Sequence, residues 1–179
     1  MSFRVLKFGG SSVADATAMS RVLDIAGAEL AKGRVVLVSS AISGCTDGLL
    51  ACAAGKTVGL AALKERHQAI VRRLFTGVER ADAAAELSRI FFEMESAPAE
   101  EKVTFGELLS TRILARKLAC EGVSVEWVDS RKLVVKDNLA ETYRRIRAAV
   151  AATDAAVVVA PGFICCDTTG KVCTLGRGG

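Results

Sequence analysis

The hydrophobic positions along the chain change their period repeatedly, and each change predicts a new element. Residues 3–8 form a short run of β-branched, aromatic and aliphatic side chains that is typical of a strand. From Ala14 the apolar positions recur at steps of three and four until Gly33, which predicts a helix that ends at this glycine. The run RVVLVSS (34–40) is apolar on both faces, as is usual for a strand buried between layers of helices.

The rest of the chain continues this alternation between helical and extended periodicity. The expected helices cover residues 49–75 (with a break at 55–59), 82–95, 104–121 and 139–152, and the expected strands cover SVEWVD (124–129) and AAVVVAPGFI (155–164). Strands that alternate with helices predict an α/β fold. We expect a mainly parallel sheet with helices on both faces, joined by right-handed crossovers.

Composition narrows the class of protein. A chain of 179 residues has the length of one domain, and its hydrophobic content of 51% excludes a disordered protein. The 24 basic and 20 acidic residues are mixed along the chain, without the basic block typical of proteins that bind nucleic acids or membrane surfaces. No stretch approaches the length of a membrane span, and the N-terminus lacks a cleavage signal. We therefore expect a cytoplasmic protein with no nucleic-acid or membrane partner.

The cysteines and the histidine predict no metal site. The six cysteines contain no C-x-x-C pair, and one histidine is too few to complete a zinc site with them. Free thiols in a reducing compartment are the better interpretation. His67 lies in a polar stretch of an expected helix, so we expect its side chain to be exposed to solvent.

The residues that follow the expected strands carry the candidate chemistry. In a parallel sheet, ligands bind at the carboxyl ends of the strands. The positions at these ends are Lys7, Gly9, Gly10, Ser11, Ser12, Ser39, Ser40, Gly44, Thr46, Asp129, Pro161, Gly162 and Phe163. Glycines, hydroxyls and one lysine, with almost no acid, favour a site for oxyanions. The backbone N–H groups of a glycine turn can approach a phosphate closely, and Lys7 would neutralise its charge.

A simpler interpretation of the Gly9-Gly10 turn is that it only connects a strand tightly to a helix. Two other motifs carry no weight. Gly55-Lys56-Thr57 imitates the end of a Walker A loop, but Leu50 stands where its first glycine is required and no strand leads into it. The dinucleotide fingerprint G-x-G-x-x-G is absent from the sequence.

Six segments together strengthen the phosphate interpretation: KFGGSSVAD, SSAISGCTDGLL, FGELLSTRILARKL, WVDSR, APGFI and TLGRGG. In this order and spacing the chain resembles, over essentially its whole length, the catalytic domain of the aspartokinases in the amino acid kinase superfamily. The resemblance implies a three-layer α/β/α sandwich. It also implies transfer of the ATP γ-phosphoryl group to the β-carboxylate of L-aspartate. The product, 4-phospho-L-aspartate, begins the biosynthesis of lysine, threonine and methionine.

The resemblance assigns a role to each matching position. It places Lys7, as the catalytic cation, on the transferring phosphate, surrounded by Gly9, Gly10 and Ser40. It places Thr46, Glu107 and Arg177 on the aspartate, in a pocket walled by Phe163, Gly178 and Gly179. ATP brings Mg²⁺ with it, so no metal site of the protein itself is implied.

Elementary chemistry agrees with these roles. An aspartate substrate needs an acid for its ammonium group and a planar cation for a carboxylate, which suits Glu107 and Arg177. The acceptor is already ionised at neutral pH, so the reaction requires no general base. Taken without the resemblance, Glu107 is better explained as an acid that stabilises the N-terminus of a helix.

The chain departs from the family pattern at its last residue. In the family the final glycines run on into Ser-Asp, the lobe that holds adenine and then regulatory ACT domains, whereas this sequence stops at Gly179. We therefore expect residues 1–179 to be the N-terminal, aspartate-binding part of a kinase domain that is inactive alone. The full-length protein would be a homo-oligomer, with or without an attached homoserine dehydrogenase.

Two alternatives stay open at this point. The first is another amino acid kinase that acts on glutamate, acetylglutamate, carbamate or a nucleoside monophosphate. The second is a non-catalytic module that binds aspartate.

Overall fold

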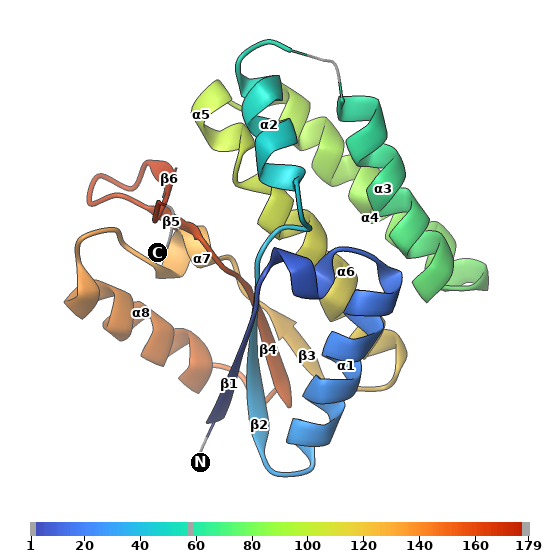
Figure 1. Cartoon of the computed structure of the whole chain (residues 1–179). Coiled ribbons are helices and arrows are strands. Elements are labelled where there is room, and N and C mark those ends of the chain that lie inside the picture. The colour runs from blue at the N-terminus through green and yellow to red at the C-terminus, as the bar shows by residue number, and fades with distance from the viewer. Residues whose placement is uncertain (1–2, 57–58, 177–179) are drawn as a thin grey trace.

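A parallel sheet of four strands forms the centre of the fold. The structure is a computed structural model, and it describes residues 3–56 and 59–176. The strands β1 (Phe3–Phe8), β2 (Arg34–Ser39), β3 (Val125–Trp127) and β4 (Val157–Pro161) lie in the order β1-β2-β4-β3, and all three pairings are parallel. The predicted parallel sheet is therefore confirmed, and β1 and β3 are its edges (Figure 1).

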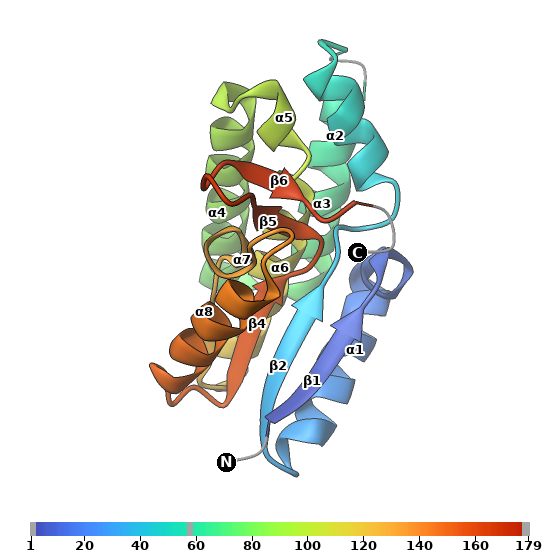
Figure 2. The same cartoon turned by 90° about the vertical axis from the view of Figure 1, so that its left-hand side faces the viewer.

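Helices cover both faces of this sheet, which confirms the predicted three-layer sandwich. The helical elements are η1 (Gly10–Val13, a 3₁₀ turn), α1 (Ala16–Leu30), α2 (Cys45–Ala53), α3 (Leu60–Leu74), α4 (Gly77–Ser96), α5 (Ala99–Lys102), α6 (Phe105–Cys120), α7 (Ser130–Leu133) and α8 (Leu139–Ala151). Helices α1 and α6 pack against one face, and α2 to α5 gather beyond α6. Helix α8 lies on the opposite face (Figures 1 and 2).

The alternation of side chains along β2 explains why the two faces differ. Val35 and Leu37 are fully buried in the main core with the apolar residues of α1 and α6. Val36 and Val38 point the other way and line an apolar cavity of about 270 Å³ between the sheet and α8. The core therefore lies mainly between the sheet and α6, while the α8 side is less tightly filled.

Short polar side chains fix where two of the helices begin. The Asp15 carboxylate accepts a hydrogen bond from the Ala18 N–H at 2.8 Å, which caps the N-terminus of α1. The Asn138 side chain accepts a hydrogen bond from the Glu141 N–H at 3.0 Å and caps α8 in the same way. Among the described residues, no helix is long and apolar enough to cross a membrane.

The structure divides one expected strand into two elements. The run 155–164 does not continue straight, because β4 ends at Pro161 and Phe163 adopts a left-handed backbone with φ of 63°. A second sheet follows, in which β5 (Ile164–Cys166) pairs antiparallel with β6 (Val172–Thr174).

Helix α4 begins at Gly77, five residues before the expected helix at 82–95.

The expectation for His67 was wrong, because its side chain is completely buried. Its Nδ1 lies 2.8 Å from the Leu63 carbonyl oxygen, and its ring meets the ring of Phe91 edge-on at 5.6 Å between centroids. Burial lowers the pKa of His67 to about 4, so the imidazole is neutral at physiological pH. The residue packs α3 against α4.

Candidate active site

Three loops meet at the carboxyl edge of the sheet, where the sequence predicts them. The loop after β2 touches both of its neighbours: the Ser40 N–H donates to the Phe8 carbonyl at 3.0 Å, and the Gly162 N–H donates to the Ser39 carbonyl at 2.8 Å. The Ser43 N–H also donates to the Gly10 carbonyl, at 3.2 Å. Backbone hydrogen bonds thus bring the turns after β1, β2 and β4 together.

Gly10 allows the first two of these loops to approach closely. A Cβ atom at this position would lie 2.9 Å from the carbonyl oxygen of Ala41, which is too short for any side chain. Gly9, by contrast, has open space on the side where a Cβ would stand. Packing therefore requires glycine at position 10, whereas at position 9 a side chain would meet no neighbouring atom within 4 Å.

Lys7 lies on the α8 side of the sheet. Its side chain is exposed, and it lines the apolar cavity together with Gly162 and Phe163. The neighbouring residues Leu6 and Phe8 pack against the core on the other face. The cation therefore reaches the carboxyl edge from the face opposite α6.

The first turn of α6 packs directly on the loop after β2. A Cβ at Gly106 would lie 2.8 Å from Ala41 Cβ and 3.0 Å from Cys45 Sγ, so only glycine permits this contact. Ser110, one turn further along α6, donates its hydroxyl to the Ser40 carbonyl at 2.8 Å. These contacts hold the N-terminus of α6 at the carboxyl edge of the sheet.

Glu107 occupies this first turn, and its carboxyl group is only partly satisfied. The residue is 2% exposed, its Oε1 accepts a hydrogen bond from the Ala41 N–H at 3.3 Å, and its buried Oε2 has no partner in the described part of the chain. Burial raises the pKa of Glu107 to about 7, against a smaller opposing effect of the Ala41 N–H. Buried acceptors are normally hydrogen-bonded, so this oxygen needs a donor that residues 3–56 and 59–176 do not supply.

The thiol of Cys45 lies beside this carboxyl group. Burial, followed by the negative charge of Glu107, raises the pKa of Cys45 to about 12, so the thiol stays neutral. Thr46, the next residue, is half-buried in the first turn of α2. The loop after β2 therefore contacts Glu107 through the Ala41 N–H, and Cys45 at the start of α2 lies beside the same carboxyl group.

Most of the predicted site residues lie at the carboxyl edge of the sheet, some on the α6 face and some on the α8 face. Gly10 and Glu107 contact the loop after β2, which contains Ser40 and leads to Thr46 in α2, whereas Lys7 and Phe163 lie on the α8 side. Arg177, Gly178 and Gly179 lie outside the described residues. Sequence reasoning missed the Ala41 N–H, Gly106 and Ser110, although the position of Ser110 one helical turn after Glu107 was a usable signal.

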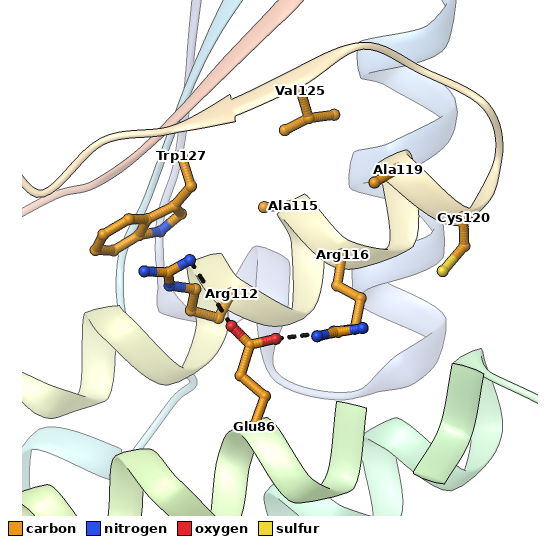
Figure 3. Close-up of a pocket in the computed structure, with 8 residues that line it drawn as sticks. All are labelled: Glu86, Arg112, Ala115, Arg116, Ala119, Cys120, Val125 and Trp127. Atoms are coloured by element: carbon orange, nitrogen blue, oxygen red, sulfur yellow. Dashed lines mark hydrogen bonds and ion pairs between the residues drawn. The ribbon is translucent and has the colours of Figure 1, made fainter. Parts of the chain in front are cut away.

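A groove of about 540 Å³ lies elsewhere, between α4, α6 and β3 (Figure 3). Glu86 accepts a hydrogen bond from Arg116 at 2.8 Å and forms a longer ion pair with Arg112 at 3.7 Å. The Arg112 guanidinium stacks on the Trp127 ring, 3.6 Å from its centroid. Because its charges pair internally and it lies beside Val125, where β3 begins, we interpret this groove as a structural junction of α4 and α6.

Potential metal ligands do not gather anywhere in residues 3–56 and 59–176: no three His, Cys, Asp or Glu side chains lie close enough together to hold an ion.

The fold and the site together define a class of protein. The parallel α/β sandwich collects glycine turns, serine hydroxyls, a lysine and a buried acid at the carboxyl ends of its strands, which suits a small anionic substrate that also carries a positive charge. The chain belongs to the amino acid kinase family, whose model matches residues 2–179.

Curated relatives agree with this assignment. The chain is 34% identical to lysine-sensitive aspartokinase 3 of Escherichia coli (strain K12), over 98% of this chain and 43% of that protein. It is 31% identical to aspartokinase 1, chloroplastic, of Arabidopsis thaliana, over 98% of this chain and 36% of that protein. The chain thus spans less than half the length of these relatives.

Solved structures show the same fold. Escherichia coli aspartokinase III, in a complex with aspartate and ADP, superposes with a TM-score of 0.84 at 29% identity, over 99% of this chain and 44% of the other. Clostridium acetobutylicum aspartate kinase superposes with a TM-score of 0.79 at 25% identity, over 100% of this chain and 43% of the other.

Proposed function

We propose that the chain is the aspartate-binding part of an aspartate kinase, which transfers the γ-phosphoryl group of ATP to the β-carboxylate of L-aspartate. The observation that carries this proposal is the buried Glu107 carboxyl group, one oxygen of which has no partner among residues 3–56 and 59–176. An ammonium group donates hydrogen bonds and carries the opposite charge, so it suits this oxygen. The aspartokinase relatives support aspartate as the amino acid that supplies it.

The remaining groups of the substrate need other partners. We assign one aspartate carboxylate to Arg177, because a guanidinium group binds a carboxylate with two parallel hydrogen bonds. Thr46 would supply a hydroxyl to the same substrate, and Phe163, Gly178 and Gly179 would wall its pocket. The resemblance of the surrounding sequence motifs to those of aspartokinases supports these assignments.

Lys7 and the loops around it would hold the phosphate. Phosphoryl transfer depends mainly on positioning and on neutralising the charge of the transferring group. Lys7 supplies the charge, the Gly9 and Gly10 turn supplies backbone N–H groups, and Ser40 supplies a hydroxyl. When bound with ATP, Mg²⁺ neutralises the phosphate oxygens, and we propose that the nucleotide holds it.

The same proposal covers the biological setting. The product would be 4-phospho-L-aspartate, the first intermediate towards lysine, threonine and methionine. We propose a cytoplasmic location, which is supported by six cysteines that are all free thiols. A homo-oligomeric full-length protein also remains part of this proposal.

Calorimetry with two matched ligands tests the role of Glu107. L-Aspartate and succinate carry the same two carboxylates, but only L-aspartate has an ammonium group. We expect the chain to bind L-aspartate more tightly than succinate, and we expect Glu107→Gln to remove most of this difference. Glu126→Gln, on the exposed part of β3, is the matched control and should behave like the wild type.

Two results would count against the assignment. One is an unchanged preference for L-aspartate in Glu107→Gln. The other is an equal loss of affinity for both ligands, which would mean that Glu107 only maintains the structure. Tighter binding of L-glutamate than of L-aspartate would contradict the proposed substrate while leaving the ammonium site in place.

A further inference from the structure

Two cysteine side chains outside the candidate active site face each other across the β5–β6 hairpin. Cys165 and Cys173 stand directly opposite in the antiparallel register, and their sulfur atoms lie 3.4 Å apart. Both are free thiols. We propose that Cys165 and Cys173 form a redox-active dithiol, which a small-molecule disulfide such as oxidised glutathione converts to an intramolecular disulfide.

The backbone geometry of the hairpin favours this bond. The Leu175 N–H donates to the Phe163 carbonyl at 2.8 Å, and hydrogen-bonded pairs recur at every second position of an antiparallel ladder. The Cys165–Cys173 pair, two residues further along, is therefore a hydrogen-bonded pair. Cα atoms in such pairs are about 5.5 Å apart, which lies within the usual range for disulfides. The sulfur atoms have to close from 3.4 Å to about 2 Å to form the bond.

The two thiols differ in access, which sets the order of reaction. Cys173 is half-buried and can meet a reagent from solvent, whereas Cys165 has no exposed surface. Burial, with a further effect of the hydrogen bond to Cys173, raises the pKa of Cys165 to about 12. Cys173 therefore reacts first, and Cys165 reacts second from within the protein.

The reaction consists of two balanced exchanges. The Cys173 thiolate attacks one sulfur of oxidised glutathione, forms a mixed disulfide and releases one glutathione thiolate. Cys165 then attacks the Cys173 sulfur, and its proton goes to the departing second glutathione. In total the protein loses two electrons and two protons and gains one S–S bond, while one oxidised glutathione becomes two reduced glutathione molecules.

The other thiols lack this arrangement. Cys166, the next residue of β5, makes its contacts with the Val134 carbonyl and with Arg145 instead. Cys120 lies in the groove beside α6. Within the described ranges, no second pair of sulfur atoms is in contact, so the proposal applies to one pair alone.

The test is oxidation of the folded chain with oxidised glutathione, followed by alkylation of the remaining thiols and mass spectrometry. The oxidised wild type should carry four alkyl groups where the reduced protein carries six, and one peptide pair should contain both Cys165 and Cys173. Cys120→Ser, the matched control, should form the same bond. Cys165→Ala should stop at the mixed disulfide on Cys173, and Cys173→Ser should keep Cys165 reduced.

Each alternative outcome would overturn the proposal. A wild type that stops at the mixed disulfide would show that Cys165 does not reach Cys173. A disulfide in Cys173→Ser that involves Cys165 would show that the pair was assigned wrongly. If Cys165→Ala does not fold, the peptide map of the wild type and the Cys173→Ser variant still decide between these outcomes. Because none of these measurements involves substrate, they are independent of the proposed kinase function.

Discussion

Glu107 is the residue at which burial and charge conflict most strongly. A buried carboxyl group without a cation is costly, and within the described part of the chain the hydrogen-bond partners of the Glu107 carboxyl group include the Ala41 N–H but no cation. This arrangement would favour binding of an ammonium group, because the ligand would supply a positive charge and hydrogen-bond donors to the Glu107 carboxyl group. Burial therefore raises the pKa of Glu107, as expected for a carboxyl group whose charge lacks a nearby cation in the described residues.

The raised pKa gives Glu107→Gln an unusual effect on stability. The folded protein holds a proton on Glu107 up to a pKa of about 7, whereas the ordinary value is 4.5, so the stability of the wild type falls as the pH rises between these values. Above that window the buried charge costs on the order of 3 kcal/mol. Glu107→Gln removes the charge and keeps an acceptor for the Ala41 N–H, so it should unfold at a higher temperature than the wild type at pH 8.

Thermal unfolding of both proteins at several pH values checks this prediction. The advantage of Glu107→Gln should shrink as the pH falls towards the ordinary pKa of a carboxyl group. An advantage that is the same at acidic and alkaline pH, or a destabilised variant at every pH, would contradict the shifted pKa.

Lys7 is expected to act on the transition state and not on the fold, because its side chain is exposed. In the full-length enzyme, Lys7→Ala should lower kcat by a factor on the order of 10² or more, since it removes a positive charge from the transferring phosphoryl group. Lys56→Ala, which removes a lysine from the rejected Walker-like motif, is the control and should keep its kcat. Steady-state kinetics with a melting curve for each variant decides the matter, and a folded Lys7→Ala with normal kcat would refute the role.

The positions of residues at the ends of strands could be predicted from the sequence, whereas contacts that depend on packing could not. Lys7 and Gly10 were identified because they lie at the carboxyl end of an apolar run and in the turn after it. The partner of Glu107 is a backbone N–H in another loop, which no pattern of side chains reveals. His67 was misjudged from its polar neighbours in sequence, although it belongs to the same helical stripe as the buried Leu63 and Ile70.

At the scale of elements, the contact between α6 and the loop after β2 positions the candidate site. Gly106→Ala tests this contact, because the added Cβ would lie 2.8 Å from Ala41 Cβ, a rigid neighbour. We expect the variant to lose about 1–3 kcal/mol of unfolding free energy and to bind L-aspartate more weakly. Gly27→Ala, in the exposed middle of α1 with open space around it, should instead gain about 1 kcal/mol.

Urea denaturation and calorimetry distinguish the two glycines. Equal effects of Gly106→Ala and Gly27→Ala on the free energy of unfolding would mean that α6 can move away from the loop without cost. A lower free energy of unfolding of Gly106→Ala with unchanged affinity for L-aspartate would mean that α6 does not position Glu107.

Elements were predicted well where periodicity continues over many residues, and poorly where a single residue redirects the backbone. The long stripes of α1, α3 and α6 identified these helices nearly to their ends. The expected strand 155–164 failed at Phe163, because a left-handed backbone at a non-glycine residue leaves no signature in an apolar run. The β5–β6 hairpin was consequently missed.

At the scale of the whole molecule, the two faces of the sheet are covered unequally. The face towards α1 and α6 carries the main core, whereas the α8 face retains an apolar cavity, and Val5 on the edge strand β1 is 69% exposed. Lys7 opens onto this second face, while Glu107 belongs to the first. In the described residues, Lys7 and Glu107 therefore stand on opposite faces of the sheet near its carboxyl edge.

The last prediction concerns the 179-residue chain by itself. The chain covers only 43% of the E. coli aspartokinase relative, and the resemblance places most of the nucleotide-binding residues of the family beyond residue 179. In-line positioning of phosphate and nucleophile supplies most of the catalysis in phosphoryl transfer. We therefore expect weak binding of L-aspartate at most, and no aspartate-dependent turnover of ATP above background.

The assay traps the acyl phosphate as a hydroxamate, with full-length E. coli aspartokinase III as the positive control. Turnover within about tenfold of this control would show that residues 1–179 contain a complete active site, and that Lys7 and Glu107 already lie in a working arrangement.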